Sequence, residues 1–411
     1  MQRKNYELRL YDEPLLGFAI ASESTPLGPT ERVEKIRPLS PNKHLLPITL
    51  LGDSGPETVR SWLGTRSIPA NRAFVDSILR SAGINNSFPS SFLDISKGLS
   101  LNDSFWVVPE GFEGKFAEFN LYENRFDKIL SLVAYTGVYA SKPLFSTSPE
   151  LTTGGMLAKA WRRRKDGHIY LYKAGSTGAR NAGLEPYSEF YVSKLAQYMG
   201  LDAVDYDLRR WKGILASVCE LFTNIDTAYV PAGHIVRSGG IKACVDYYDS
   251  LGESFGQAIR NMLVFDALVC QEDRHFGNFG LLRDNKTGRF SSPAPLFDNG
   301  IALLNYALDE DISTDEKLDN YVLTRSTPYG MSYAEVCFKY MTRDMHERLR
   351  KILSYSLPCH AKYNLPQPRL DFLERFIRRR AGQLLNIPPV PLFKKQDRQP
   401  PTGDCLSCPD R

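Results

Sequence analysis

Two short polar motifs in the C-terminal half of the chain have residue types and spacing suited to phosphoryl transfer. Residues 273–278 read Asp-Arg-His-Phe-Gly-Asn, and residues 298–300 read Asp-Asn-Gly. This chemistry needs one carboxylate to accept or orient the proton of an attacking hydroxyl, an amide oxygen to hold a metal ion, and a second carboxylate to bridge metal and phosphates. Magnesium prefers oxygen ligands, so Asn278 and Asp298 are chemically suited to bind it.

Two unrelated surface loops are the alternative interpretation, because Asp, Asn and Gly are also the usual residues of Asx-turns. The Asp-Asn-Gly motif on its own would be read as such a turn. The pattern Asp-Arg-His-x-x-Asn is more specific, since average residue usage produces it by chance on the order of once in a thousand chains of this length. With both motifs present in this order, the sequence favours a phosphoryl-transfer site.

A strand and a helix further upstream could supply a lysine for the phosphates and a carboxylate to pair with it. In the strand predicted over residues 168–173, alternation places Lys173 on the same face as Ile169 and Leu171. In the helix predicted over residues 186–200, Glu189 extends the apolar stripe, where a carboxylate needs a cation. The alternatives are a strand-end lysine that reaches solvent and an exposed helix glutamate.

Two segments could enclose a nucleotide. Gly154 and Gly155 precede the lysine strand and would let backbone N–H groups approach phosphate oxygens, although an ordinary hairpin turn has the same composition. A strand is predicted over residues 214–222. If the protein is a kinase, backbone groups near Glu220 and Phe222 at the end of this strand would contact adenine.

Two further side chains lie close to the catalytic motif. Asp266 falls on the apolar stripe of a predicted helix that leads into the motif, so we expect it to bond the loop backbone or His275. A contact within its own helix is the alternative. His275 could support the metal-binding loop through its ring nitrogens, or be an ordinary hydrogen-bonded histidine.

The order Lys173, Glu189, motif 273–278 and Asp298 resembles the HipA-like serine/threonine kinases of bacteria, over roughly residues 148–385. The resemblance implies ATP and magnesium in the cleft of a two-lobed kinase fold. It implies Asp273 as the catalytic base, Asn278 and Asp298 as metal ligands, and Lys173 as the phosphate contact held by Glu189.

The resemblance also bears on regulation and partners. In this family a serine before the lysine strand is autophosphorylated, which ejects the glycine loop, and Thr152 is the matching position here. The implied substrates are proteins, including the kinase itself. The family also suggests a toxin–antitoxin role with a small antitoxin-like DNA-binding partner.

The predicted fold class is α+β: a protein-kinase-like fold with a β-rich N-lobe and a mostly helical C-lobe. An accessory domain is predicted over residues 1–145, the N-lobe over 146–225, the C-lobe over 226–386, and a flexible Pro-rich tail over 387–411. Helices are expected over residues 70–80, 127–135 and 368–385. Nothing in the accessory domain carries recognisable chemistry.

Composition excludes several classes of protein. The chain is 42 % hydrophobic and 24 % charged with a net charge of +4, so it is neither disordered nor basic enough to argue for direct nucleic-acid binding. We see no membrane span and no signal peptide, and the scattered cysteines suit a reducing cytoplasm. Cys405 and Cys408 form only half of a zinc motif.

Two other functions remain open. Phosphoinositide kinases share the order in which Asp precedes His, so a lipid or small-molecule kinase is one alternative, although the near-neutral charge weighs against a phosphoinositide substrate. Glu272 adds a carboxylate beside Asp273, where the family has other residues. A nucleotide-binding pseudokinase that serves as a scaffold is therefore the second alternative.

Overall fold

The computed structural model describes residues 2–26, 28–84, 88–139 and 147–391. Within these ranges, no helix combines the length and apolar character that a membrane crossing requires. Cys405, Cys408 and most of the predicted Pro-rich tail lie outside the described residues.

The N-terminal region is built on an antiparallel sheet with the strand order β3-β2-β1-β4. Along β1, Tyr6, Leu8 and Leu10 alternate with more exposed residues, and this buried face packs on the first helices. The strands are β1 (Gln2–Leu10), β2 (Glu13–Thr25), β3 (Gly28–Pro38) and β4 (Phe105–Pro109). The helical elements are η1 (Lys43–Leu45), η2 (Ile48–Leu50), α1 (Pro56–Gly64), α2 (Val75–Ser81), α3 (Pro89–Ser96), α4 (Phe116–Phe119) and α5 (Lys128–Thr136).

Two helices of this region were expected from the sequence. Helix α5 matches the predicted helix 127–135, because Asp127 accepts hydrogen bonds from the N–H groups of Ile129 and Leu130 and Gly137 ends the helix with a φ of 74°. Helix α2 is shorter than the predicted helix 70–80. It begins only at Val75, because Phe74 adopts the left-handed conformation with a φ of 61°.

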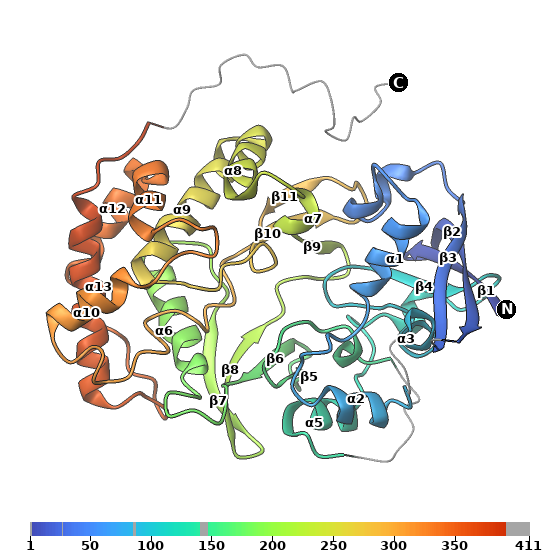
Figure 1. The fold of residues 1–411 in the computed structure, drawn as a ribbon, viewed down its shortest axis with the longest axis horizontal. Coiled ribbons are helices and arrows are strands. Elements are labelled where there is room, and N and C mark those ends of the chain that lie inside the picture. Colours follow the sequence, from blue (N-terminus) through green and yellow to red (C-terminus); the bar gives the residue numbers. More distant parts are fainter. Residues whose placement is uncertain (1, 27, 85–87, 140–146, 392–411) are drawn as a thin grey trace.

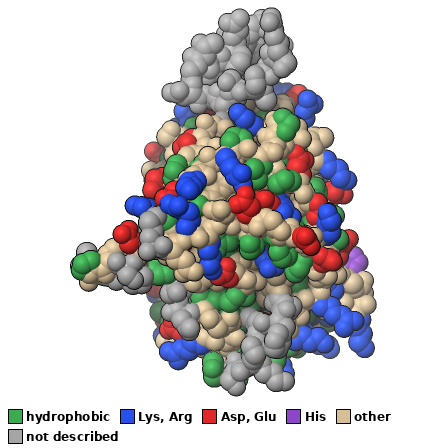
Figure 2. All heavy atoms as spheres, turned by 90° about the vertical axis from the view of Figure 1, so that its right-hand side faces the viewer, with side chains coloured by type: hydrophobic (Ala, Val, Ile, Leu, Met, Phe, Trp, Pro, Cys, Tyr) green, Lys and Arg blue, Asp and Glu red, His purple; other side chains and the backbone are tan. Residues whose placement is uncertain are grey.

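The outer face of the N-terminal region carries charges of both signs. Figure 2 shows lysines and arginines interspersed with acidic side chains on this face. In this region Arg3 of β1 pairs with Glu34 of β3, and Lys4 of β1 pairs with Asp94 of α3. The face in view therefore does not form one continuous basic field of the kind that binds nucleic acid.

A second antiparallel sheet, with the order β5-β6-β8-β7, forms the N-lobe (Figure 1). Its strands are β5 (Lys159–Arg163), β6 (Ile169–Ala174), β7 (Tyr206–Trp211) and β8 (Ile214–Glu220), preceded by η3 (Pro149–Leu151). Ala160, Tyr172 and Val218 pack with Tyr135 of α5 on one face. Helix α6 (Glu185–Tyr198) packs against β6, β7 and β8, and Leu208 of β7 joins the core that contains its buried residues.

The C-lobe is mostly helical and occupies the left half of Figure 1. A small sheet with the order β11-β10-β9 borders it. Helix α9 is buried along nearly its whole second half, and it shares its core with α6 and α13. The elements are β9 (Thr227–Pro231), α7 (Ala232–Ile235), α8 (Gly240–Leu251), α9 (Glu253–Val269), β10 (Gly280–Asp284), β11 (Phe290–Pro293), α10 (Asp315–Leu323), α11 (Tyr333–Tyr340), α12 (Arg343–Ile352) and α13 (Gln367–Leu385).

The described architecture confirms the predicted α+β fold, with a β-rich N-lobe and a helical C-lobe. The long helix predicted over 368–385 is α13. The N-terminal region is fastened to the C-lobe by Arg283 of β10, which donates hydrogen bonds to the carbonyl oxygens of Leu46 and His44 at 2.8 and 2.6 Å.

Candidate active site

Lys173 of β6 lies between two carboxylates that come from distant parts of the chain. Its Nζ is 2.9 Å from Oε1 of Glu189 on α6, and it also contacts Oδ1 of Asp298. Burial alone would lower the pKa of Lys173, but the charges of Asp298 and Glu189 raise it above its usual value. The structure thus brings together three of the residues that the sequence analysis singled out.

The loop that carries Asp298 is held in place by both lobes. Glu189 accepts a hydrogen bond from the N–H of Asn299 at 2.8 Å, so one carboxylate connects the strand lysine to this loop. Asp298 has a φ of 54°, a conformation that non-glycine residues seldom adopt. A side chain at Gly300 would press on Glu185 and approach the amine of Lys173, so glycine suits the close packing there.

The charge of Asp298 is set by its neighbours. Burial alone would raise its pKa, but the ammonium groups of Lys173 and Lys159 lower it to about 2. Its side chain is still 34 % exposed. Asp298 therefore remains an anionic oxygen donor that a ligand can reach.

Residues 273–278, the predicted catalytic motif, lie in the loop between α9 and β10. The Nδ2 of Asn278 donates to the carbonyl oxygen of Asp273 at 2.9 Å, which leaves its Oδ1 available as an acceptor. Burial raises the pKa of Asp273, and the nearby Asp298 adds to this while His275, Lys173 and Arg274 oppose it. Asp273 thus lies within electrostatic reach of both Lys173 and Asp298.

Arg274 is the residue that holds the loops together, and the sequence analysis assigned it no role. Its guanidinium donates to both oxygens of Asp266, to the carbonyl oxygen of Asn278 at 3.1 Å and to Oδ1 of Asn299 at 2.6 Å. The expectation that Asp266 bonds the loop backbone or His275 was wrong, because this fully buried arginine takes both of its oxygens. An arginine inside a motif that follows an apolar helix is the signal that could have revealed the pair.

His275 and Glu272 have local partners. His275 is exposed, and its Nδ1 accepts a hydrogen bond from the N–H of Gly277 at 3.0 Å, which steadies the turn of the loop. Glu272, the unusual carboxylate beside Asp273, is 3.4 Å from Arg325. Its charge is therefore balanced by a cation of the C-lobe.

The glycine loop, residues 152–158, is anchored by the N-terminal region. Arg72 donates to the carbonyl oxygens of Thr153 and Lys159 at 2.7 and 3.0 Å and pairs with Glu150. The hydroxyl of Thr152 is buried and donates to the carbonyl oxygen of Leu99 at 2.8 Å. A side chain at Gly154 would extend into open space, whereas a side chain at Gly155 would overlap the amine of Lys159.

The segment predicted to contact adenine joins the two lobes. The side chain of Glu220 is exposed and pairs with His168 at the edge of the sheet. The ring of Phe222 packs against Phe297 with 5.3 Å between centroids, one residue before Asp298. Phe222 therefore lies next to the loop that carries Asp298, while the carboxylate of Glu220 faces His168.

Two side chains of the site carry oxygen atoms of the kind that magnesium prefers. Asp298 and Asn278 offer a carboxylate and an amide oxygen, and magnesium commonly binds one or two protein oxygens and completes its shell with phosphates and water. In the described part of the chain, no group of three His, Cys, Asp or Glu residues could hold a metal by itself. The donor set therefore suits a metal that arrives with phosphate.

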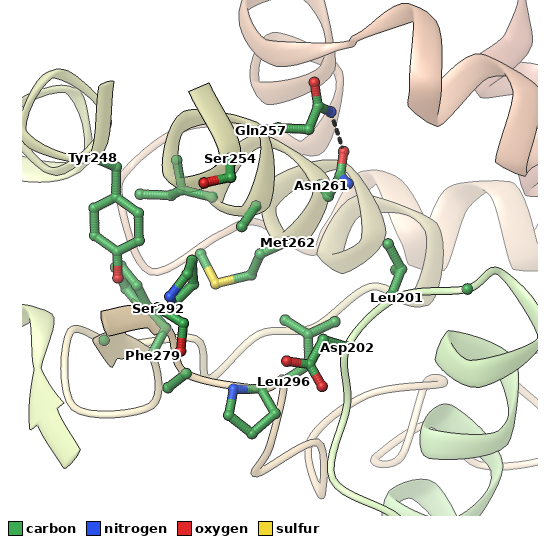
Figure 3. Close-up of a pocket in the computed structure, with 17 residues that line it drawn as sticks. Leu201, Asp202, Tyr248, Ser254, Gln257, Asn261, Met262, Phe279, Ser292 and Leu296 are labelled. Atoms are coloured by element: carbon green, nitrogen blue, oxygen red, sulfur yellow. Dashed lines mark hydrogen bonds between the residues drawn. The ribbon is translucent and has the colours of Figure 1, made fainter. Parts of the chain in front are cut away.

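A cavity lies apart from this site, between α8, α9 and β10 (Figure 3). It has a volume of about 380 Å³ and is lined by apolar side chains such as Met262, Phe279 and Leu296. No lysine or arginine lines it within the described residues, and Asp202 adds a negative charge. The cavity therefore does not suit a triphosphate, and we place no catalytic step in it.

No protein-family model and no curated protein matches this sequence. The solved structures that are similar to this chain include the following two. A proinflammatory kinase of Helicobacter pylori, CtkA, is 16 % identical with a TM-score of 0.47, and the match covers 57 % of this chain and 91 % of that chain. A chain from the Shewanella oneidensis MR-1 toxin–antitoxin complex of HipA, HipB and operator DNA is 12 % identical with a TM-score of 0.49, covering 93 % and 98 %.

Proposed function

We propose that this chain is an ATP-dependent phosphotransferase that acts on serine or threonine hydroxyls of proteins, including its own. One observation carries the proposal. Lys173 of the N-lobe sheet, Glu189 of α6 and Asp298 of the C-lobe meet in one cluster, and Asp273 lies within reach of its charges. If the two motifs were unrelated surface turns, nothing would require residues so far apart in the chain to lie together.

Each residue has a distinct role in the proposed reaction. Asn278 and Asp298 would hold magnesium, which neutralises charge on the phosphates when it is bound. Asp273 accepts the proton of the attacking hydroxyl, while the oxygen of that hydroxyl bonds to the terminal phosphorus of ATP. The bond from this phosphorus to the bridging oxygen breaks, and its electron pair leaves with ADP. The upward shift in the pKa of Asp273 makes it a better base near neutral pH.

Glu272 bears on the choice between an active kinase and a pseudokinase. An unpaired carboxylate beside the base would repel the phosphates, but Glu272 is paired with Arg325. The ion pair favours an active enzyme.

Autophosphorylation at Thr152 stays a prediction. The hydroxyl of Thr152 is buried against Leu99 in the described conformation. The glycine loop must therefore move away from Leu99 before this residue can react. A small antitoxin-like DNA-binding partner is likewise proposed only from the resemblance of the motifs.

Phosphate transfer from radiolabelled ATP with magnesium tests the function. Wild-type protein should incorporate label, and Asp273→Asn should reduce the rate by about 100- to 10,000-fold. Asp246→Asn, the same change in an exposed aspartate of α8, is the matched control and should label normally. Equal labelling by wild type and Asp273→Asn would refute the assigned base. Transfer to lipid vesicles but to no polypeptide would favour a lipid kinase, and magnesium-dependent ATP binding without transfer would favour a pseudokinase.

A further inference from the structure

A second lysine lies beside Lys173 in the same sheet. Lys159 at the start of β5 is paired in register with Lys173 of the antiparallel strand β6. Residues directly opposite each other in neighbouring strands project from the same face of the sheet. The next pair along, Ala160 and Tyr172, packs toward α5, so both lysines point to the opposite face, toward the cleft. Lys159 is only 6 % exposed.

The two lysines differ in how their charges are balanced. Lys173 has two carboxylate partners, Glu189 and Asp298. The amine of Lys159 donates to the carbonyl oxygen of Gly154 at 2.9 Å, and it forms no ion pair with any residue that the structure describes. Burial, together with repulsion from Lys173, lowers the pKa of Lys159 to about 7. Buried charges are normally paired, so this amine lacks an anion.

The surroundings of Lys159 are built around its amine. Gly155 lies directly over it with a φ of 84°, and no other residue would fit there without displacing the lysine. Arg72 binds the carbonyl oxygen of Lys159 at 3.0 Å and so fixes the first residue of the strand. The amine of Lys159 also interacts electrostatically with Lys173 and Asp298 of the cleft.

We propose that Lys159 is a second anion-binding residue of this cleft beside Lys173: an oxygen of the nucleotide polyphosphate replaces the carbonyl oxygen of Gly154 as the partner of its amine. The inference rests on the proposed function and deepens it. The charge of Lys173 is already balanced by two carboxylates, so Lys159 supplies an additional positive charge that the phosphates neutralise. The released carbonyl frees the glycine loop to settle over the bound nucleotide.

Calorimetric titration of the full chain with ATP, adenosine and inorganic tripolyphosphate tests the proposal. Lys159→Met should weaken the binding of ATP and of tripolyphosphate by about 10- to 100-fold, since hydrogen bonds to charged groups are of this strength. Adenosine affinity should not change, because it lacks phosphates. Lys165→Met, in the exposed turn between β5 and β6, is the matched control and should bind all three as wild type does.

A second variant separates the charge from the hydrogen bond. Lys159→Gln keeps a donor for the carbonyl oxygen of Gly154 but removes the charge, so it should lose tripolyphosphate binding as Lys159→Met does. Loss of an unpaired buried charge should not lower the thermal unfolding temperature of either variant. Unchanged tripolyphosphate affinity in either folded variant would overturn the proposal.

The same measurements separate this inference from the proposed function. If wild type transfers phosphate and binds ATP, but both Lys159 variants bind ATP and tripolyphosphate equally well, only the role of Lys159 is wrong. If wild type binds neither ATP nor tripolyphosphate, the proposed function fails together with it.

Discussion

Two buried ion-pair clusters of this protein look alike in composition but differ in their surroundings. Arg72 and Glu150 pair at 2.9 Å where the N-terminal region meets the glycine loop, and both side chains are 0 % exposed. Lys173, Glu189 and Asp298 form the second cluster in the cleft, where Asp298 is 34 % exposed.

The partners of the two clusters explain the difference. In the first, Arg72 also donates to three carbonyl oxygens, and Oε1 of Glu150 accepts from the N–H of Trp161 at 2.8 Å. In the second, Asp298 faces the cleft, with the unpaired Lys159 nearby. A buried ion pair by itself is therefore no sign of a functional site. The sign is a charged group that the protein leaves for a ligand.

The first prediction concerns a substitution that breaks the fully buried pair of Arg72 and Glu150. Arg72→Met should lower the free energy of unfolding by about 3–5 kcal/mol, because it leaves the carboxylate of Glu150 buried without its cation. Urea denaturation measures this change. The double variant Arg72→Met, Glu150→Gln should recover part of the loss, since no unpaired charge then remains. A stable single variant would contradict a structural role for this pair.

The second prediction concerns a substitution in the cluster of Lys173, Glu189 and Asp298 in the cleft. Asp298→Asn should slow phosphate transfer by about 100- to 1,000-fold, because it removes an anionic oxygen at the candidate metal site. Its free energy of unfolding should change by less than about 1 kcal/mol, since asparagine tolerates the left-handed backbone of this position. Radiolabel transfer and urea denaturation measure the two quantities. Destabilisation as large as that of Arg72→Met would erase the distinction between the clusters.

The third prediction concerns pH. The pKa of Lys159 is about 7 without a nucleotide, and a bound polyphosphate should raise it, so binding takes up a proton above pH 7. ATP affinity should therefore fall by about tenfold between pH 7 and 9. The other charged groups that face Lys159 are Lys173, Asp298, Glu189 and Arg72, and the raised pKa of Lys173 and the lowered pKa of Asp298 keep these two charged over that range.

Titrations of ATP at pH 7, 8 and 9 measure this dependence. Lys159→Arg should show a flatter profile, because a guanidinium keeps its proton throughout the range. A profile as steep as that of wild type would mean that another group takes up the proton.

The sequence predicted the parts of the site that depend on local periodicity. Alternation in β6 placed Lys173 on a buried face, and the stripe of α6 placed Glu189 toward a cation. The pairing of these two residues is seen in the structure. The predicted two-lobed fold did not follow from these patterns, because it was implied by the resemblance of the motifs to a kinase family.

Other features could not be predicted from the sequence, because they depend on contacts between distant segments. The N-terminal sheet was not predicted, since the pairing of β1 with β4 joins residues about a hundred positions apart. The role of Arg72 could not be read from its local sequence, because it binds a loop about 80 positions away. The bond from Arg274 to Asn299 likewise joins two separate loops. The sequence assigned no role to Lys159, whose position opposite Lys173 depends on the pairing of β5 with β6.

The sequence by itself determined which chemical groups are present and which way each strand or helix turns them, because side-chain direction follows the period of the local backbone. Only the tertiary structure decided which charges are neutralised. Electrostatic balance depends on distances across the fold, and these distances pair Lys173 with two carboxylates while they leave Lys159 with a carbonyl oxygen alone.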